Sequence, residues 1–258
     1  MRAWLRNKQS KTADYIFSQR GTESSRLEQL SDGVFALAIT LLLVSLETPK
    51  TGDELVLFAK DFLSFALSTI ILIVIWYSHY LYFLRYGLRD KTTTIINTWL
   101  LVVVLFFVYP LKFIISFMLG YLKYLFLMTF GFDYDQQAFI YLVTEVSSWE
   151  KLPFIMMIYS GGYLALMLSF AFFYRHAYKN REALALSPEE EEKTCLLMML
   201  CFIQCSVALI SIVIAFGATF SSIPWLAILA GMVYFLLGPL VFVFERVFRK
   251  RKQRARLD

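Results

Sequence analysis

Residues 26–47 read RLEQLSDGVFALAITLLLVSLE, a stretch with a carboxylate, Asp32, at the start of its apolar part and two hydroxyls, Thr40 and Ser45, among its leucines. At about 100° per residue, one stripe of such a helix collects Leu30, Gly33, Leu37, Thr40, Leu41 and Val44. Asp32 falls on the opposite side. The stretch therefore predicts a helix with an apolar face that carries one hydroxyl and a separate face that carries a carboxylate.

Five more apolar blocks follow this one, and 59% of the 258 residues are hydrophobic. That share is too high for an ordinary soluble domain. The blocks lie at 31–47, 54–84, 95–118, 152–174, 194–218 and 223–245. All except the first are long enough to cross ~30 Å of hydrocarbon, whereas the first reaches only about 24 Å and is expected inside a protein assembly. We predict an all-α, polytopic membrane protein with six transmembrane helices.

Charge predicts the orientation of these helices. Of the 25 basic residues, 20 fall on the side of the bilayer that both termini share. The positive-inside rule then makes both termini cytoplasmic. We expect a cytoplasmic segment at 1–30, a six-helix transmembrane domain at 31–245 and a basic cytoplasmic tail at 246–258. The tail adjoins a membrane span, so its expected partner is anionic lipid and not nucleic acid.

The run SPEEEEK at 187–193 predicts a solvated helix start capped by Ser187.

The stripe on the first helix has two interpretations, which spacing alone leaves open. It is either a packing face or a pore lining, in which rings of leucine exclude water and Thr40 offers oxygen to a cation. Asp32 is costly inside a membrane and is a candidate functional residue. Its expected partner is His79, near the inner end of the second span. His79 is then a hydrogen-bonding anchor or, alternatively, an ordinary interfacial histidine.

The first helix closely resembles the signature of the transmembrane protein 175 family of potassium-permeable channels. That signature reads Arg, three residues, then Phe-Ser-Asp, and prokaryotic members continue Gly-Val-Phe-Ala-Ile-Ala-Ile-Thr-Leu-Leu. The chain matches it at Arg26, Ser31, Asp32 and most positions of 33–42, and departs from it at Leu30 and Leu37. The stretch WYSHY at 76–80 is similar to the family's Trp-x-x-His-His, with Tyr80 in place of the second histidine.

The resemblance implies a homotetrameric potassium channel of the leak type in the cell membrane, with a pore lined by the first helix of each subunit. By position, the implied hydrophobic constriction is Leu37, Leu41 and Val44, and Thr40 is the hydroxyl layer beside it. The implied network that anchors the helix is Arg26, Ser31, Asp32, Trp76 and His79. The resemblance implies no enzyme activity, no cofactor and no metal beyond permeating potassium.

Two other functions compete with this interpretation. The stretch MTFGFDY at 128–134 resembles the re-entrant filter of ordinary potassium channels, but it lacks the second glycine that such a filter needs. A proton-coupled secondary transporter could use Asp32 and His79 as a relay. Against it, the sequence has no internal repeat and no matching pair of broken spans. The three cysteines, Cys195, Cys201 and Cys205, lack a metal-binding spacing and are expected to be small apolar residues.

Overall fold

The computed structural model describes residues 17–46, 49–133, 135–141, 151–221 and 225–254. Six helical segments in this part of the chain are long and apolar enough to cross a membrane, as the sequence predicts. The elements, in chain order, are α2 (Arg26–Val44), α3 (Gly52–Tyr86), α4 (Lys91–Thr129), α5 (Gln136–Tyr141), α6 (Leu152–Lys179), α7 (Pro188–Phe220), α8 (Trp225–Met232), the 3-10 turn η2 (Val233–Leu236) and α9 (Leu237–Arg254).

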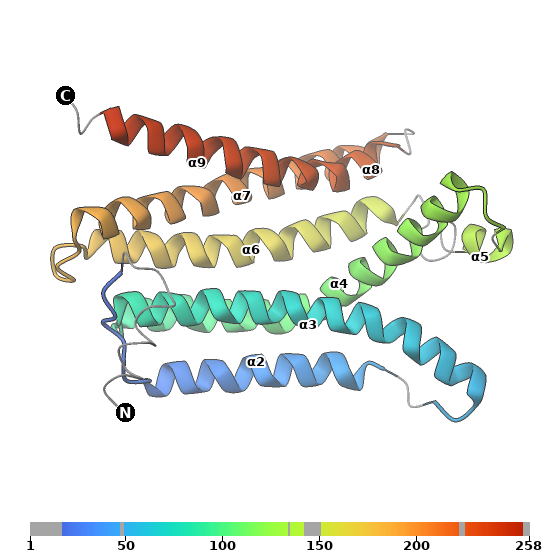
Figure 1. Cartoon of the computed structure of the whole chain (residues 1–258), viewed down its shortest axis with the longest axis horizontal. Coiled ribbons are helices and arrows are strands. Elements are labelled where there is room, and N and C mark those ends of the chain that lie inside the picture. Colours follow the sequence, from blue (N-terminus) through green and yellow to red (C-terminus); the bar gives the residue numbers. More distant parts are fainter. Residues whose placement is uncertain (1–16, 47–48, 134, 142–150, 222–224, 255–258) are drawn as a thin grey trace.

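The long helices lie roughly side by side along one axis (Figure 1). The start of α2 and the end of α9 lie at the same end of this bundle, as do the α3–α4 and α6–α7 connections. Among the described residues, Arg85, Arg89, Arg175 and Lys193, which are expected at the cytoplasm, lie in or near these segments. The arrangement therefore agrees with an even number of crossings and with the charge asymmetry.

Capping residues extend the helices beyond the apolar blocks. The N-cap of α2 is Ser25, whose side chain accepts from Glu28 N, while Glu28 accepts from Ser25 N at 2.9 Å. This capping box starts the helix at Arg26, five residues before the apolar block. Ser187 and Glu190 form the same box at α7, with Pro188 in its first turn, which confirms the predicted helix start.

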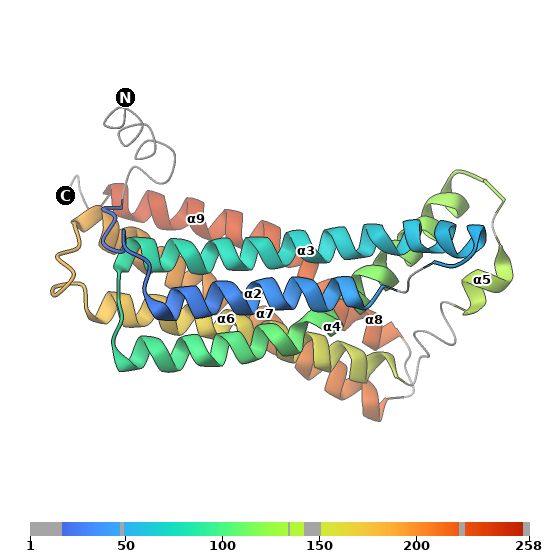
Figure 2. The same cartoon turned by 90° about the horizontal axis from the view of Figure 1, so that it is seen from below.

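Two helices depart from simple spans. The 39-residue α4 continues well past residue 118, contains Pro110 and bends near its middle in both views (Figures 1 and 2). The sixth span contains a 3-10 turn, because η2 lies between α8 and α9. Pro239 lies just beyond η2 and cannot donate the backbone hydrogen bond that a continuous α-helix needs there. The block expected at 223–245 is confirmed as a span, because Leu226–Phe248 together are long and apolar enough to cross a membrane.

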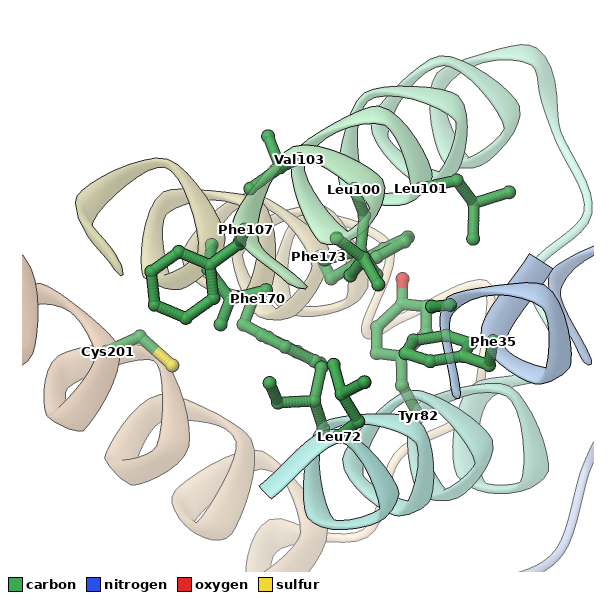
Figure 3. Packing of buried hydrophobic residues seen from close by; sticks show 14 of the residues in the cluster. Phe35, Leu72, Tyr82, Leu100, Leu101, Val103, Phe107, Phe170, Phe173 and Cys201 are labelled. Atoms are coloured by element: carbon green, nitrogen blue, oxygen red, sulfur yellow. The ribbon is translucent and has the colours of Figure 1, made fainter. Parts of the chain in front are cut away.

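The main core lies where α2, α3, α4 and α6 meet (Figure 3). It contains Phe35, Leu72, Tyr82, Leu100 and Phe173, all almost fully buried. Close packing of α4 on α6 depends on Gly162, since a β-carbon there would lie 2.5 Å from the Phe107 ring. One face of α2 is thus held firmly against the rest of the protomer.

Candidate pore helix and its anchors

The two faces of α2 have opposite environments. Ser31, Phe35, Ala38 and Leu42 recur every three or four residues and are buried against the protomer. Leu37 is 50% exposed and Val44 is 74% exposed, and Leu30 and Thr40 are exposed with them. α2 lies between α3 and α4 with one side uncovered (Figure 2). The face that the sequence singled out is therefore free in a single protomer.

Leu41 differs from the other stripe residues. It is partly buried and packs against the main core, so it lies at the edge of the uncovered face. Thr40 lies well inside this face, and its hydroxyl donates to Ala36 O at 2.9 Å. Because that bond uses the only hydroxyl proton, the oxygen lone pairs of Thr40 remain available to a ligand outside the helix.

Asp32 is fixed by α3, but not through the residue expected from the sequence. Trp76 Nε1 donates to Asp32 Oδ1 at 2.7 Å. The Trp76 ring stacks on Tyr80, with ring centroids 6.0 Å apart. The bond joins the start of α2 to α3 through a charged acceptor, which makes it stronger than a neutral hydrogen bond. The expected partner, His79, bonds elsewhere.

His79 belongs to a buried chain of hydrogen bonds that connects three helices. His79 Nε2 donates to Asn97 Oδ1 at 2.7 Å, and Asn97 Nδ2 donates to Ser31 Oγ at 2.9 Å. Ser31 donates in turn to Leu27 O at 2.8 Å. His79, Asn97 and Ser31 are each at most 1% exposed. Ser31 of α2 is thereby tied to α4 and, through Asn97, to α3.

Asn97 is a residue that the sequence analysis missed. The available signal was its polarity within the apolar block 95–118, where an amide must find partners.

Arg26 was expected in the anchoring network, but it is exposed at the first turn of α2. Among the described residues, no hydrogen bond or ion pair joins Arg26 to Asp32, Ser31, Trp76 or His79. The structure brings these four together around the inner half of α2.

The segment before α2 is held by a second set of contacts at the inner end. The two terminal guanidinium nitrogens of Arg20, Nη1 and Nη2, each lie 2.8 Å from an oxygen of the Glu190 carboxylate. Ser18 N donates to the same carboxylate at 2.7 Å, and Arg20 Nε donates to Leu184 O at 2.8 Å. Glu190 is only 1% exposed. Arg20 thus connects the chain leading into α2 with the start of α7.

The outer end of α2 also has an anchor. Lys112 Nζ, from α4, lies 2.6 Å from Ser45 Oγ and 3.1 Å from Ser45 O. Ser45 is the C-cap of α2. The sequence analysis left Ser45 without a role and did not single out Lys112. The pore-helix candidate is therefore attached in its inner half and at its outer end.

The stretch 128–134 lies at the far end of α4. Met128 and Thr129 belong to this helix, Phe130 is its C-cap, and Gly131 has a φ of +69°. α4 is continuous from Lys91 to Thr129 (Figure 1). In the described part of the chain, this single helix leads away from the inner end of the bundle directly into the stretch, and it does not turn back toward that end before it. This course does not favour a re-entrant filter.

This chain resembles known proteins over nearly its whole length. The profile of the family described as "Endosomal/lysosomal potassium channel TMEM175" matches residues 26–108. A potassium channel of Marivirga tractuosa is 38% identical over 251 residues, which cover 94% of each chain. A potassium channel of Streptomyces collinus is 31% identical over 88 residues, 32% of this chain and 43% of that protein.

A solved structure resembles the fold as well. It is the crystal structure of a variant of the potassium channel MtTMEM175 in complex with a Nanobody-MBP fusion protein. It shares 38% sequence identity with this chain and has a TM-score of 0.77, with 92% of this chain and 98% of that chain covered. The likeness thus extends far beyond the signature in α2.

Proposed function

Because the chain belongs to the TMEM175 family of potassium channels, a family of multi-pass membrane proteins and not of enzymes, we propose that it is a potassium-permeable leak channel lined by α2. The observation that carries this proposal is the uncovered face of α2, where Leu37, Thr40 and Val44 are exposed although the helix is anchored along its length. A fixed helix with one free apolar face is suited to surround an axis with its copies.

The pathway requires several protomers. α2 has 19 residues, about 28 Å of helix, and lies at the edge of its own bundle. The proposed assembly is a homotetramer in which four copies of α2 enclose one central axis. The remaining spans would form the lipid-facing wall, and the basic end of α9 would lie on anionic lipid at the inner surface.

The proposed constriction consists of rings of Leu37 and Val44, with Leu41 at their flank. Leucine and valine rings of small radius exclude water and so resist ion passage. Thr40, one turn from Leu37, would place a ring of hydroxyl oxygens beside the narrow region. Its lone pairs would partly replace the water that a potassium ion sheds there. Potassium is the proposed permeant ion, and no cofactor is part of this mechanism.

The anchors of α2 would hold the width of this constriction. Ser31 is buried on the protomer side of the helix and bonds to α4, and Asp32, which is exposed, bonds to α3. They would not contact the ion. Their role in the proposal is to prevent α2 from rotating, because a rotation of one residue, about 100°, would replace the apolar stripe by another face.

A secondary transporter is the second candidate function, and the 3-10 turn inside the sixth span is the observation that favours it. The structure gives it less support at Asp32 and His79, since Asp32 bonds to Trp76 and His79 to Asn97. A relay would need these two groups to exchange a proton. Saturable flux driven by a pH gradient in liposomes would favour the transporter.

The decisive experiment measures ion flux through the purified protein in liposomes. We expect a cation current whose reversal potential follows the potassium gradient more closely than the sodium gradient. Leu37→Ala should increase the current, because it widens the water-excluding ring. The control is Leu43→Ala, an exposed leucine of α2 that lies outside the stripe. Unchanged currents in Leu37→Ala would contradict the assignment of α2 as the pore helix.

A further inference from the structure

Lys112 is an unusual residue for its position. It is the only charged residue between Lys91 and Lys123, a stretch otherwise rich in leucine, valine, isoleucine and phenylalanine. A charged side chain within a membrane span is costly and indicates a specific role. Lys112 is partly buried, and its ammonium group binds the side chain and the backbone of Ser45.

The binding of Lys112 to Ser45 has a clear electrostatic reason. The C-terminus of a helix carries a partial negative charge, and α2 has no basic residue in its own last turn. Lys112 supplies the missing positive charge from α4. Among the described residues, no carboxylate lies within ion-pair distance of Lys112, although Asp61 of α3 is close enough to act on it electrostatically. Lys112 therefore brings a positive charge to the outer end of α2.

This charge lies beside the outer end of the proposed pathway. Ser45 directly follows Val44, the last residue of the proposed constriction. It falls about 80° around α2 from Leu37, at the edge between the uncovered face and the buried face. The ammonium group 2.6 Å from the Ser45 hydroxyl consequently lies at the level where a cation would enter or leave.

We propose that Lys112 limits the cation conductance at the outer entrance. There, the ammonium groups of the subunits, one from each, surround the pathway and lower the local potassium concentration. The inference rests on the proposed function, because it requires α2 to lie at the axis. Charges that line an entrance change the local concentration of permeating ions, and salt screens this effect. The screening length is about 10 Å at 0.1 M salt and about 3 Å at 1 M.

The test is the unitary conductance for potassium entering from the outer side, recorded in planar bilayers at 0.02 M and at 1 M KCl. Lys112→Gln should raise the conductance about twofold at low salt, and Lys112→Glu should raise it further. Lys112→Arg keeps the charge and should resemble the unchanged protein. At 1 M KCl, all four proteins should converge. The matched control is Lys123→Gln, because Lys123 belongs to the same helix but lies over the Tyr124 ring, away from α2.

Two results would overturn the inference. Equal changes at both salt concentrations would show that Lys112 only holds the helix in place. No change at either concentration would make it an ordinary interfacial lysine. Leu37→Ala is recorded in the same series to separate the two proposals. If it alters conductance while the Lys112 variants do not, only the role of Lys112 fails; if neither does, the pore helix itself is wrongly assigned.

Discussion

Trp76 and Asp32 are joined by a hydrogen bond of 2.7 Å that fixes the start of α2 against α3. A bond to a charged acceptor contributes about 1.5 kcal/mol or more. We expect a double-mutant cycle of Asp32→Ala and Trp76→Phe, measured by thermal unfolding in detergent, to give a coupling of about that size. A cycle of Asp32→Ala with Tyr80→Phe serves as the control and should show almost none. Equal coupling in both cycles would contradict the bond.

The chain from His79 through Asn97 to Ser31 predicts a ranking of two substitutions. Asn97→Ala leaves both His79 and Ser31 buried without their shared partner, and should cost about 2–3 kcal/mol. Ser31→Ala removes only the end of the chain, leaves one amide proton of Asn97 without an acceptor, and should cost about 1 kcal/mol. Thermal unfolding of the two variants checks the order. A larger loss in Ser31→Ala would show that Asn97 is not the central residue.

The ion pair of Arg20 and Glu190 predicts a loss of stability when the arginine is removed. Arg20→Ala leaves the buried Glu190 carboxylate without its cation, and we expect about 3 kcal/mol of destabilisation. For a chain of this size, that corresponds to a melting temperature lower by roughly 6–10 °C. Glu189→Gln changes an exposed carboxylate in the same helical turn and is the matched control. Similar melting temperatures for both variants would rule out the pair as a stabilising contact.

Two neighbouring glycines of α6 should respond oppositely to alanine. At Gly162 the new methyl group would meet the Phe107 ring at 2.5 Å, so Gly162→Ala should cost about 1–3 kcal/mol. At Gly161 nothing lies within 4 Å of the new methyl group, and Gly161→Ala should stabilise the helix by about 0.5–1 kcal/mol. Melting temperatures that shift in the same direction would show that α4 and α6 are packed less closely than the structure indicates.

Asp90, the N-cap of α4, predicts a dependence on acid pH. Burial alone would raise its pKa, but hydrogen bonds with Thr93 and His176 prevail and lower the pKa of Asp90 to about 2. A pKa that is lower in the folded protein gives stability that is present above the unfolded value of 3.8 and is lost as the pH falls toward 2. The stability difference between the unchanged protein and Asp90→Asn should therefore be present at pH 5 and shrink below about pH 4. A difference that stays constant down to pH 2.5, measured by thermal unfolding, would contradict this assignment.

The sequence by itself determined the six apolar spans, the side of the membrane on which both termini are expected and the two faces of the first helix. These features follow from local quantities: the length and composition of a block, the charges beside it and the 3.6-residue period. The match of Arg26, Ser31 and Asp32 to a family signature was equally readable, because it depends only on residue order. The caps at Ser187 and Pro188 followed from local chemistry in the same way.

Only the tertiary structure decided which polar residues meet. The sequence suggested that Asp32 would pair with His79, since both lie near the inner ends of their spans. Depth alone does not determine how each helix is rotated about its axis, and side-chain packing turned Trp76 toward Asp32 and His79 toward Asn97. The same holds for Lys112 and Ser45, which are 67 residues apart and meet only because α4 packs against α2. Hydrogen bonds between spans depend on helix rotation and bending, and these are set by the packing of the whole bundle.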